Sequence, residues 1–206
     1  MIKIKNISEA QIDEISCQIA GAFYDYNYAP NEKGLRMYIK SRKDMFVYMN
    51  AIVRAAYKTG VLFSTSENHE GYIMLSGKDI PRIGLLDGLK MIAAEKKALG
   101  GFRNMKKFVT ACFSDGGTIE MRMKKAKRDY IRIEILVVRR EYQKQGYMRK
   151  MLDDVYALAQ RKGVPVILDT YDKDKCSRYE HLGMKLDRIR KCGEGLNMYD
   201  LIKENE

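Results

Sequence analysis

The segment around Gly146 has the residue types of a phosphate-binding site. An apolar run at 130–138 leads into the basic loop 139–147. An amphipathic segment follows and ends at Gly163, with apolar residues at helical spacing: Met148, Met151, Leu152, Val155, Leu158 and Ala159. A strand, a glycine loop and a helix together present free backbone N–H groups at the positive end of a helix dipole. The pattern therefore predicts that the protein holds a phosphorylated ligand.

Two common phosphate loops do not fit this segment. A dinucleotide-binding loop requires GxGxxG with an acidic residue about 20 residues further on. Asp169 is placed for the acid, but Gly146 is the only one of the three glycines present. The GxxxxGK[ST] loop of the P-loop proteins has no match in the chain.

A third type of loop fits this segment. Because of this loop, the chain from Val138 onward resembles the GNAT superfamily of acyl-CoA-dependent N-acyltransferases. The family signature is [QR]xxGx[GA] at the start of a helix, matched here by 143–148, with Met148 where a small residue is usual. A second block, 176–184, resembles the family's YExxGF helix. The resemblance is specific over about 130–200 and holds in outline over the first two helices and the 61–76 hairpin.

The resemblance implies acetyl-CoA (CoA) as the cofactor and assigns its binding residues. Backbone groups of three strand residues would pair with pantetheine, and amides of the loop and first helical turn would hold the pyrophosphate. The strand residues are Leu136, Val137 and Val138, and the loop residues are Gln143, Lys144, Gln145, Gly146, Tyr147 and Met148.

The resemblance also implies two catalytic residues, each with an alternative structural role. Tyr179 matches the family tyrosine that acts as general acid to the CoA sulfur; the alternative is a helix tyrosine packed under Leu182. Glu134 lies where some members place a general base, often acting through water; the alternative is an ion pair with Arg132 or another cation. Strand alternation predicts that the side chains at 132, 134, 136 and 138 share one face.

The acceptor amine is not identified by these motifs. Tyr24, Tyr26 and Tyr28 fall between the first two helices, where the family builds acceptor pockets. Tyrosines in such a loop also serve as packing residues.

The chain carries a net charge of +11, and much of it is concentrated near the glycine loop. Residues 121–150 contain eleven Lys and Arg against three Asp and Glu, a local excess of +8. This excess has two interpretations, a solvated surface or a field that attracts a polyanion. The four cysteines are scattered, with no CxxC and no clustered histidine, so we expect reduced thiols and no metal site.

Periodicity predicts the elements that position these residues. Helices are expected near 8–23, 35–59, 81–99, 102–112, 147–162 and 174–182, and strands near 61–65, 72–76, 130–138, 164–170, 184–191 and 196–202. Residues 118–128 fit either a strand or a helix. The 130–170 unit predicts a right-handed βαβ crossover and hence two parallel strands.

These observations predict an α/β fold: a GNAT-type mixed, mostly antiparallel central sheet with flanking helices and one parallel βαβ cofactor unit. We expect one domain over 1–206 with a helical insertion at about 78–128. The expected function is a cytoplasmic N-acetyltransferase that transfers an acetyl group from acetyl-CoA to a primary amine of a small molecule or peptide. No membrane partner is expected, and a homodimer is left open. The alternatives are a basic nucleic-acid-binding module, disfavoured because most aromatic residues lie in apolar stripes, and a non-catalytic acyl-CoA-binding domain.

Overall fold

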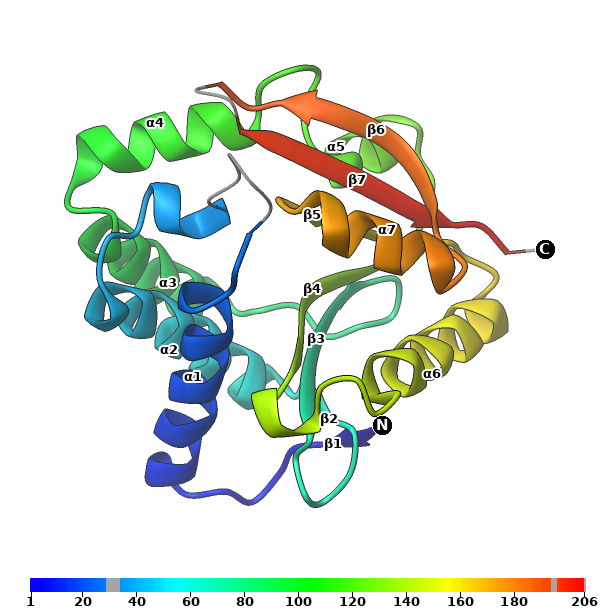
Figure 1. Cartoon of the computed structure of the whole chain (residues 1–206), viewed down its shortest axis with the longest axis horizontal. Helices are drawn as coiled ribbons and strands as arrows, with labels where there is room; N and C mark the ends of the chain where they lie inside the picture. The colour runs from blue at the N-terminus through cyan, green and yellow to red at the C-terminus, as the bar shows by residue number, and fades with distance from the viewer. Residues whose placement is uncertain (29–33, 194–195, 206) are drawn as a thin grey trace.

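A seven-stranded sheet in the order β1-β2-β3-β4-β5-β7-β6 runs through the molecule (Figure 1). The structure is a computed structural model that describes residues 1–28, 34–193 and 196–205. The strands are β1 (Ile2–Lys3), β2 (Leu62–Ser64), β3 (Gly71–Gly77), β4 (Ile131–Val138), β5 (Val166–Thr170), β6 (Lys185–Lys191) and β7 (Asn197–Lys203). The helices are α1 (Glu9–Tyr24), α2 (Arg42–Thr59), α3 (Leu85–Ala98), α4 (Phe102–Cys112), α5 (Ile119–Lys125), α6 (Tyr147–Lys162) and α7 (Lys173–His181), with 3-10 turns at Gly34–Met37 and Arg140–Tyr142.

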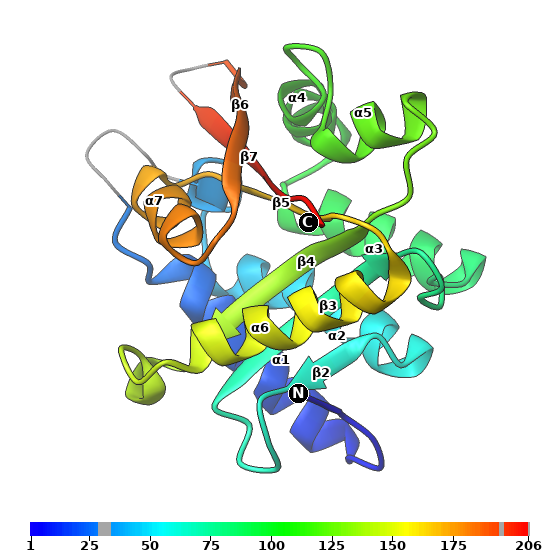
Figure 2. The same ribbon diagram turned by 90° about the vertical axis from the view of Figure 1, so that its right-hand side faces the viewer.

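One strand pair is parallel and the others are antiparallel, which confirms the expected fold class. β4 and β5 are parallel and are joined through α6, as the βαβ pattern predicted. Figure 2 shows α6 lying across β3 and β4. On the opposite face of these strands, α1 and α2 pack over a separate apolar cluster.

β4 contains a β-bulge at Glu134. Met74 pairs with Ile135 while Leu75 pairs with Ile133, so β4 has one residue more than β3 at this point. A bulge reverses the alternation of side chains beyond it and bends the strand. Ile135 therefore packs with the α1 and α2 cluster, whereas Leu136 packs with the α6 cluster.

The prediction that 132, 134, 136 and 138 share one face was therefore wrong in its second half. Arg132 and Glu134 do lie together, because their side chains form an ion pair. Leu136 and Val138 turn to the α6 side, because the extra residue at the bulge shifts the alternation by one.

Several element boundaries differ from the prediction for local reasons. The predicted helix 35–59 is a 3-10 turn followed by α2, because the Ser41 side chain accepts a hydrogen bond from the Asp44 N–H and starts a new helix. The ambiguous segment 118–128 forms α5, whose first turn is capped in the same way by Thr118. Among the described residues, no helix has both the length and the apolar character needed to span a bilayer.

Candidate active site

A cleft of about 1730 Å³ opens where β4 and β5 separate. These two strands pair only at Ile131 with Val166 and at Arg132 with Ile167. Beyond the bulge, the rest of β4 pairs with β3 alone among the described strands, so its other edge faces the cleft. The cleft is also lined by residues 139–144 and 146–149, by α7 and by the C-terminal end of α1.

The N-terminus of α6 forms one end of the cleft. Gly146 is the N-cap residue with φ of 83°, and within the described structure no side chain caps this end. The first helical hydrogen bond runs from the Lys150 N–H to the Gly146 carbonyl, so the N–H groups of 147–149 have no acceptor within the helix. A Cβ at position 146 would meet no atom within 4 Å. This end of α6 therefore presents open donors suited to an anion.

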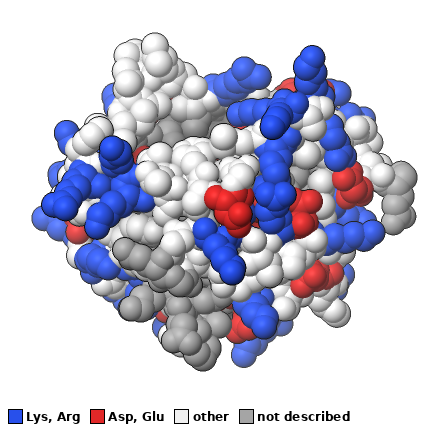
Figure 3. All heavy atoms as spheres, turned by 90° about the horizontal axis from the view of Figure 1, so that it is seen from above, with Lys and Arg blue, Asp and Glu red and all other residues white. Residues whose placement is uncertain are grey.

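The loop before α6 supplies cations to the same region. The Arg139 guanidinium is held 2.5 Å from the Glu141 carboxylate. Arg140, Lys144 and Arg149 also line the cleft, and they form no ion pair with any described residue. On the face drawn in Figure 3, by contrast, basic side chains lie in separate groups and acidic side chains adjoin some of them.

The predicted cofactor residues are brought together, with two qualifications. Leu136, Val137 and Val138 line the cleft along the free edge of β4, but the Val138 carbonyl already accepts a hydrogen bond from the Gln143 side chain at 3.3 Å. Gln143, Lys144, Gly146, Tyr147 and Met148 also line the cleft. Gln145 does not, because its side chain turns back to donate to the Glu141 carbonyl.

Tyr179 lies on α7 and is 7% exposed. It packs in the apolar cluster of α6 and also lines the cleft. Burial raises the pKa of its hydroxyl above the ordinary tyrosine value, so the group keeps its proton at neutral pH. The arrangement suits a proton donor.

Glu134 lies at the bulge with its carboxylate held from two sides. Ser76 Oγ donates to Oε1 at 2.5 Å, and Arg132 Nε lies 3.2 Å from Oε2. Burial raises the pKa of the Glu134 carboxyl above its usual value, although Arg132 and Ser76 act in the opposite direction. The ion pair between Glu134 and Arg132, which was the alternative role for Glu134, is therefore present. The Glu134 carboxylate still lines the cleft, and its affinity for a proton is increased.

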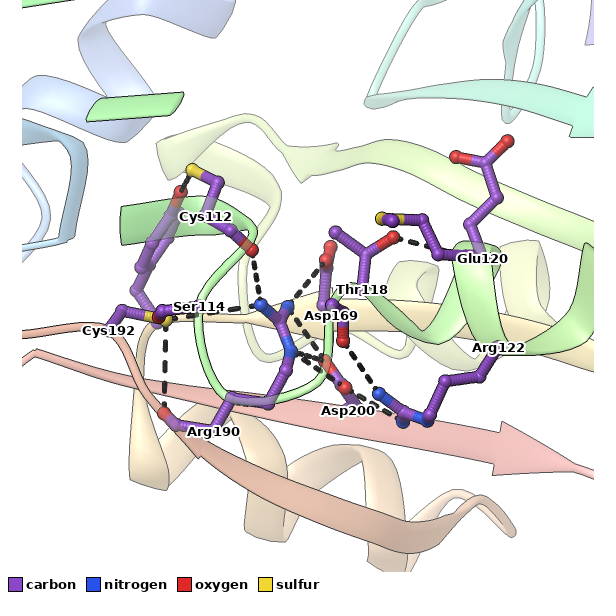
Figure 4. Close-up of polar contacts among 12 residues, drawn as sticks. Cys112, Ser114, Thr118, Glu120, Arg122, Asp169, Arg190, Cys192 and Asp200 are labelled. Atoms are coloured by element: carbon purple, nitrogen blue, oxygen red, sulfur yellow. Dashed lines mark hydrogen bonds and ion pairs between the residues drawn. The ribbon is translucent and has the colours of Figure 1, made fainter. Parts of the chain in front are cut away.

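Arg132 also connects Glu134 to a buried network of charges. Its guanidinium lies 2.7 Å from Glu120 and 3.2 Å from Asp169. Asp169 in turn contacts Arg190, which forms a pair with Asp200 at 2.9 Å in which both side chains are 0% exposed (Figure 4). The network fixes β4, β5, β6 and β7 relative to one another at the base of the cleft.

The acceptor side of the cleft includes two of the three loop tyrosines. Tyr26 and Tyr28 line the cleft, whereas Tyr24 donates to the Lys40 carbonyl at 3.0 Å and lies away from it. The helical segment 78–128 also contributes to the lining, through Ile83, Met91 and Phe108. The sequence patterns did not indicate that these three residues would reach the site.

Comparisons with known proteins agree with this geometry. Residues 104–184 match the model of the Acetyltransferase (GNAT) family. The fold resembles that of a histone acetyltransferase HPA2 and related acetyltransferase from Corynebacterium glutamicum, at 10% identity over 100% of this chain and 98% of that chain, with a TM-score of 0.59. It also resembles a polyamine N-acetyltransferase from Drosophila melanogaster, at 9% identity over 97% of this chain and 98% of that chain, with a TM-score of 0.58.

A further solved structure matches only in part. The ribosomal-protein-S18-alanine N-acetyltransferase from Escherichia coli is 17% identical over 36% of this chain and 53% of that chain, with a TM-score of 0.31. This chain thus spans about half the length of that protein. No curated protein sequence matches the chain.

The fold, with its single parallel strand pair and the cleft between those strands, is similar to that of these two acetyltransferases, and residues 104–184 match the GNAT family model.

Proposed function

We propose that the protein is an N-acetyltransferase that moves an acetyl group from acetyl-CoA to a primary amine of a small molecule or peptide. The observation that carries this proposal is the departure of β4 from β5 at the Glu134 bulge. It creates a cleft that has a free strand edge along one wall, an uncapped helix N-terminus at one end and a buried tyrosine opposite. As part of the same proposal, residues 1–206 form one domain, and 78–128 is an insertion that shapes the acceptor side of the cleft.

The residues of the cleft fit acetyl-CoA, which supplies the acetyl thioester when bound. The N–H groups of 147–149 and the unpaired cations Arg140, Lys144 and Arg149 suit a pyrophosphate. The free edge of β4 suits the amide groups of pantetheine, which can pair with it as another strand would. A Cβ at 146 would stand in open space, so the glycine leaves room for close approach.

Glu134 and Tyr179 have complementary roles in the proposed chemistry. Glu134 removes the proton from the acceptor ammonium, directly or through water, and its raised pKa brings it closer to neutral pH, where a general base is most effective. Tyr179 gives its proton to the departing thiolate. Its buried hydroxyl is protonated at neutral pH, as this role requires.

Two measurements test this proposal. CoA should raise the melting temperature, because a ligand that binds only the native state stabilises it, whereas NAD and ATP should have much smaller effects. Acetyl-CoA should then release free thiol in the presence of at least one amine from a panel of small amines and peptides. An equal shift with NAD, or no shift with millimolar CoA, would be incompatible with the proposed function.

A further inference from the structure

Lys175 projects into the cleft, where its ammonium is surrounded by three aromatic rings. Lys175 Nζ is 3.8 Å from the centroid of the Tyr26 ring, 5.7 Å from that of Phe23 and 5.8 Å from that of Tyr28. Rings at these distances attract a cation and hold it in a defined place. The rings belong to the end of α1 and the loop after it, so the lysine lies between α7 and the N-terminal part of the chain.

Lys175 is also close to the residue that the proposed function places beside the thioester sulfur. Lys175 and Tyr179 are four residues apart on α7, so they emerge on the same face of the helix, with Cβ atoms about 5–6 Å apart. Both side chains line the cleft. A flexible four-carbon stem brings the amine within reach of an acetyl group bound next to Tyr179.

Burial of Lys175 favours the neutral amine, which is the form that can attack a carbonyl, and it acts against the attraction of the three rings for the charged form. Burial lowers the pKa of Lys175 to about 8, and nearby Arg178 acts in the same direction while Asp172 opposes it. A larger fraction of Lys175 is therefore neutral at pH 7 than of a lysine with the ordinary pKa. The Asp172 carboxylate also accepts hydrogen bonds from the Tyr26 hydroxyl at 3.2 Å and from the Lys175 backbone N–H at 2.7 Å.

We propose that Lys175 is a modification site at which the protein acetylates itself, using acetyl-CoA bound in its own cleft. The Lys175 nitrogen forms a bond to the acetyl carbon, and the carbon–sulfur bond breaks with its electron pair remaining on sulfur. Tyr179 protonates the thiolate and regains a proton from solvent, while the nitrogen loses one proton to solvent. The products are CoA thiol and Nε-acetyllysine. This inference rests on the proposed function, because it uses the same cleft and the same acyl donor.

Mass spectrometry of the full chain incubated with acetyl-CoA, in the absence of any amine acceptor, tests the proposal. Peptide mapping should show one predominant acetyl group, at Lys175, formed at least about tenfold faster than at any exposed lysine because of its larger neutral fraction. The rate per molecule should not depend on protein concentration, and excess CoA should suppress it. Lys175→Arg should abolish this labelling, whereas Lys173→Arg, an exposed position on the same helix, should leave it unchanged.

A second variant separates transfer in the cleft from chemical acetylation at the surface. Tyr179→Phe should slow labelling of Lys175 and leave the background on exposed lysines unchanged. Acetyl groups spread over exposed lysines, labelling that accelerates with protein concentration, or an unmodified Lys175 would overturn the proposal. If Lys175 stays unmodified while CoA still raises the melting temperature and amines still release thiol, this inference fails alone. If CoA causes no shift at all, the proposed function fails and this inference fails with it.

Discussion

Gly146 and Gly163 lie at the two ends of α6 and provide a matched test of the anion site. Both have left-handed backbones, with φ of 83° and 63°, and an added Cβ would meet no atom within 4 Å at either position. Replacing either by alanine costs about 1–2 kcal/mol, because side chains disfavour this conformation. For a chain of 206 residues, we expect each variant to lower the melting temperature by about 2–8 °C.

Only Gly146→Ala should weaken CoA binding. Its methyl group stands in the open space next to the N–H groups of 147–149, where a pyrophosphate has to approach. Gly163→Ala adds the same methyl group beyond the other end of a 16-residue helix, about 24 Å away. By calorimetry, we expect the Kd for CoA to rise at least about tenfold for Gly146→Ala, or about 1.4 kcal/mol, and to stay within about twofold for Gly163→Ala.

The comparison between the two variants decides the outcome. An equal loss of CoA affinity in both would show that it follows from destabilisation of α6 and not from a blocked approach. Unchanged affinity in Gly146→Ala, in a protein that still binds CoA, would mean that the pyrophosphate lies elsewhere and would refute the assignment of this helix end.

Four further predictions concern the proposed catalytic pair and the buried network. Tyr179→Phe should lower kcat by about 10²–10⁴ with little change in the KM for acetyl-CoA, and near-full turnover would make the hydroxyl structural. Glu134→Gln should reduce activity most at low pH, where the acceptor is protonated, with partial recovery as the pH rises; an equal loss at every pH would exclude a base. Ser76→Ala removes a hydrogen bond that favours the ionised form of Glu134, so the pKa of Glu134 should rise further. The acid limb of the pH–rate profile should then move up by about one pH unit. The same substitution made in the Glu134→Gln variant should cause no such shift. Asp200→Asn breaks the buried pair with Arg190 and should lower the free energy of unfolding in urea by about 3 kcal/mol; a change below about 1 kcal/mol would show that Asp169 alone satisfies the arginine.

Elements with strong local signals were predictable from the sequence. α6 has the predicted bounds of 147–162, because its apolar stripe, its preceding glycine loop and Gly163 are all local features. The parallel pairing of β4 and β5 also followed from local order, since a helix must separate two parallel strands. By contrast, β7 lies between β5 and β6, and a pattern of strands and turns cannot specify that placement.

The bulge at Glu134 was not predictable, because the signal for it lies in another strand. Residues 131–138 form an apolar run with charges only at 132 and 134, and this run fits an uninterrupted strand as well as a bulged one. The extra residue can be identified only from the pairing of β4 with β3. The contact between Ser76 and Glu134 depends on the same pairing across 58 residues of sequence.

Lys175 illustrates the same limit within the site. Residues 176–184 were recognised from a family motif, but Lys175 lies just before that block, so the motif assigns it no role. Its environment is made by Tyr26, which lies close to Asp172 although 146 residues separate them in sequence. Local motifs therefore identified the residues that we propose contact the cofactor, and tertiary contacts determined which other groups lie beside them.

The positive charge of 121–150 is divided between cations that are paired within the fold and cations that are not. Arg122 forms ion pairs with Asp187 and Asp200, and Arg132 is shared among three carboxylates, so these cations are neutralised within the fold. Arg140, Lys144 and Arg149 form no ion pair with the described residues and line the cleft around the N-terminus of α6. Lys125, Lys127 and Lys150 also form no ion pair with the described residues, but they are exposed and do not line the cleft. The three unpaired cations at the cleft suit a pyrophosphate better than a long polyanion, whose binding would need many phosphate contacts. Because few unpaired cations of this segment line the cleft, the affinity for CoA should fall only gently as salt increases.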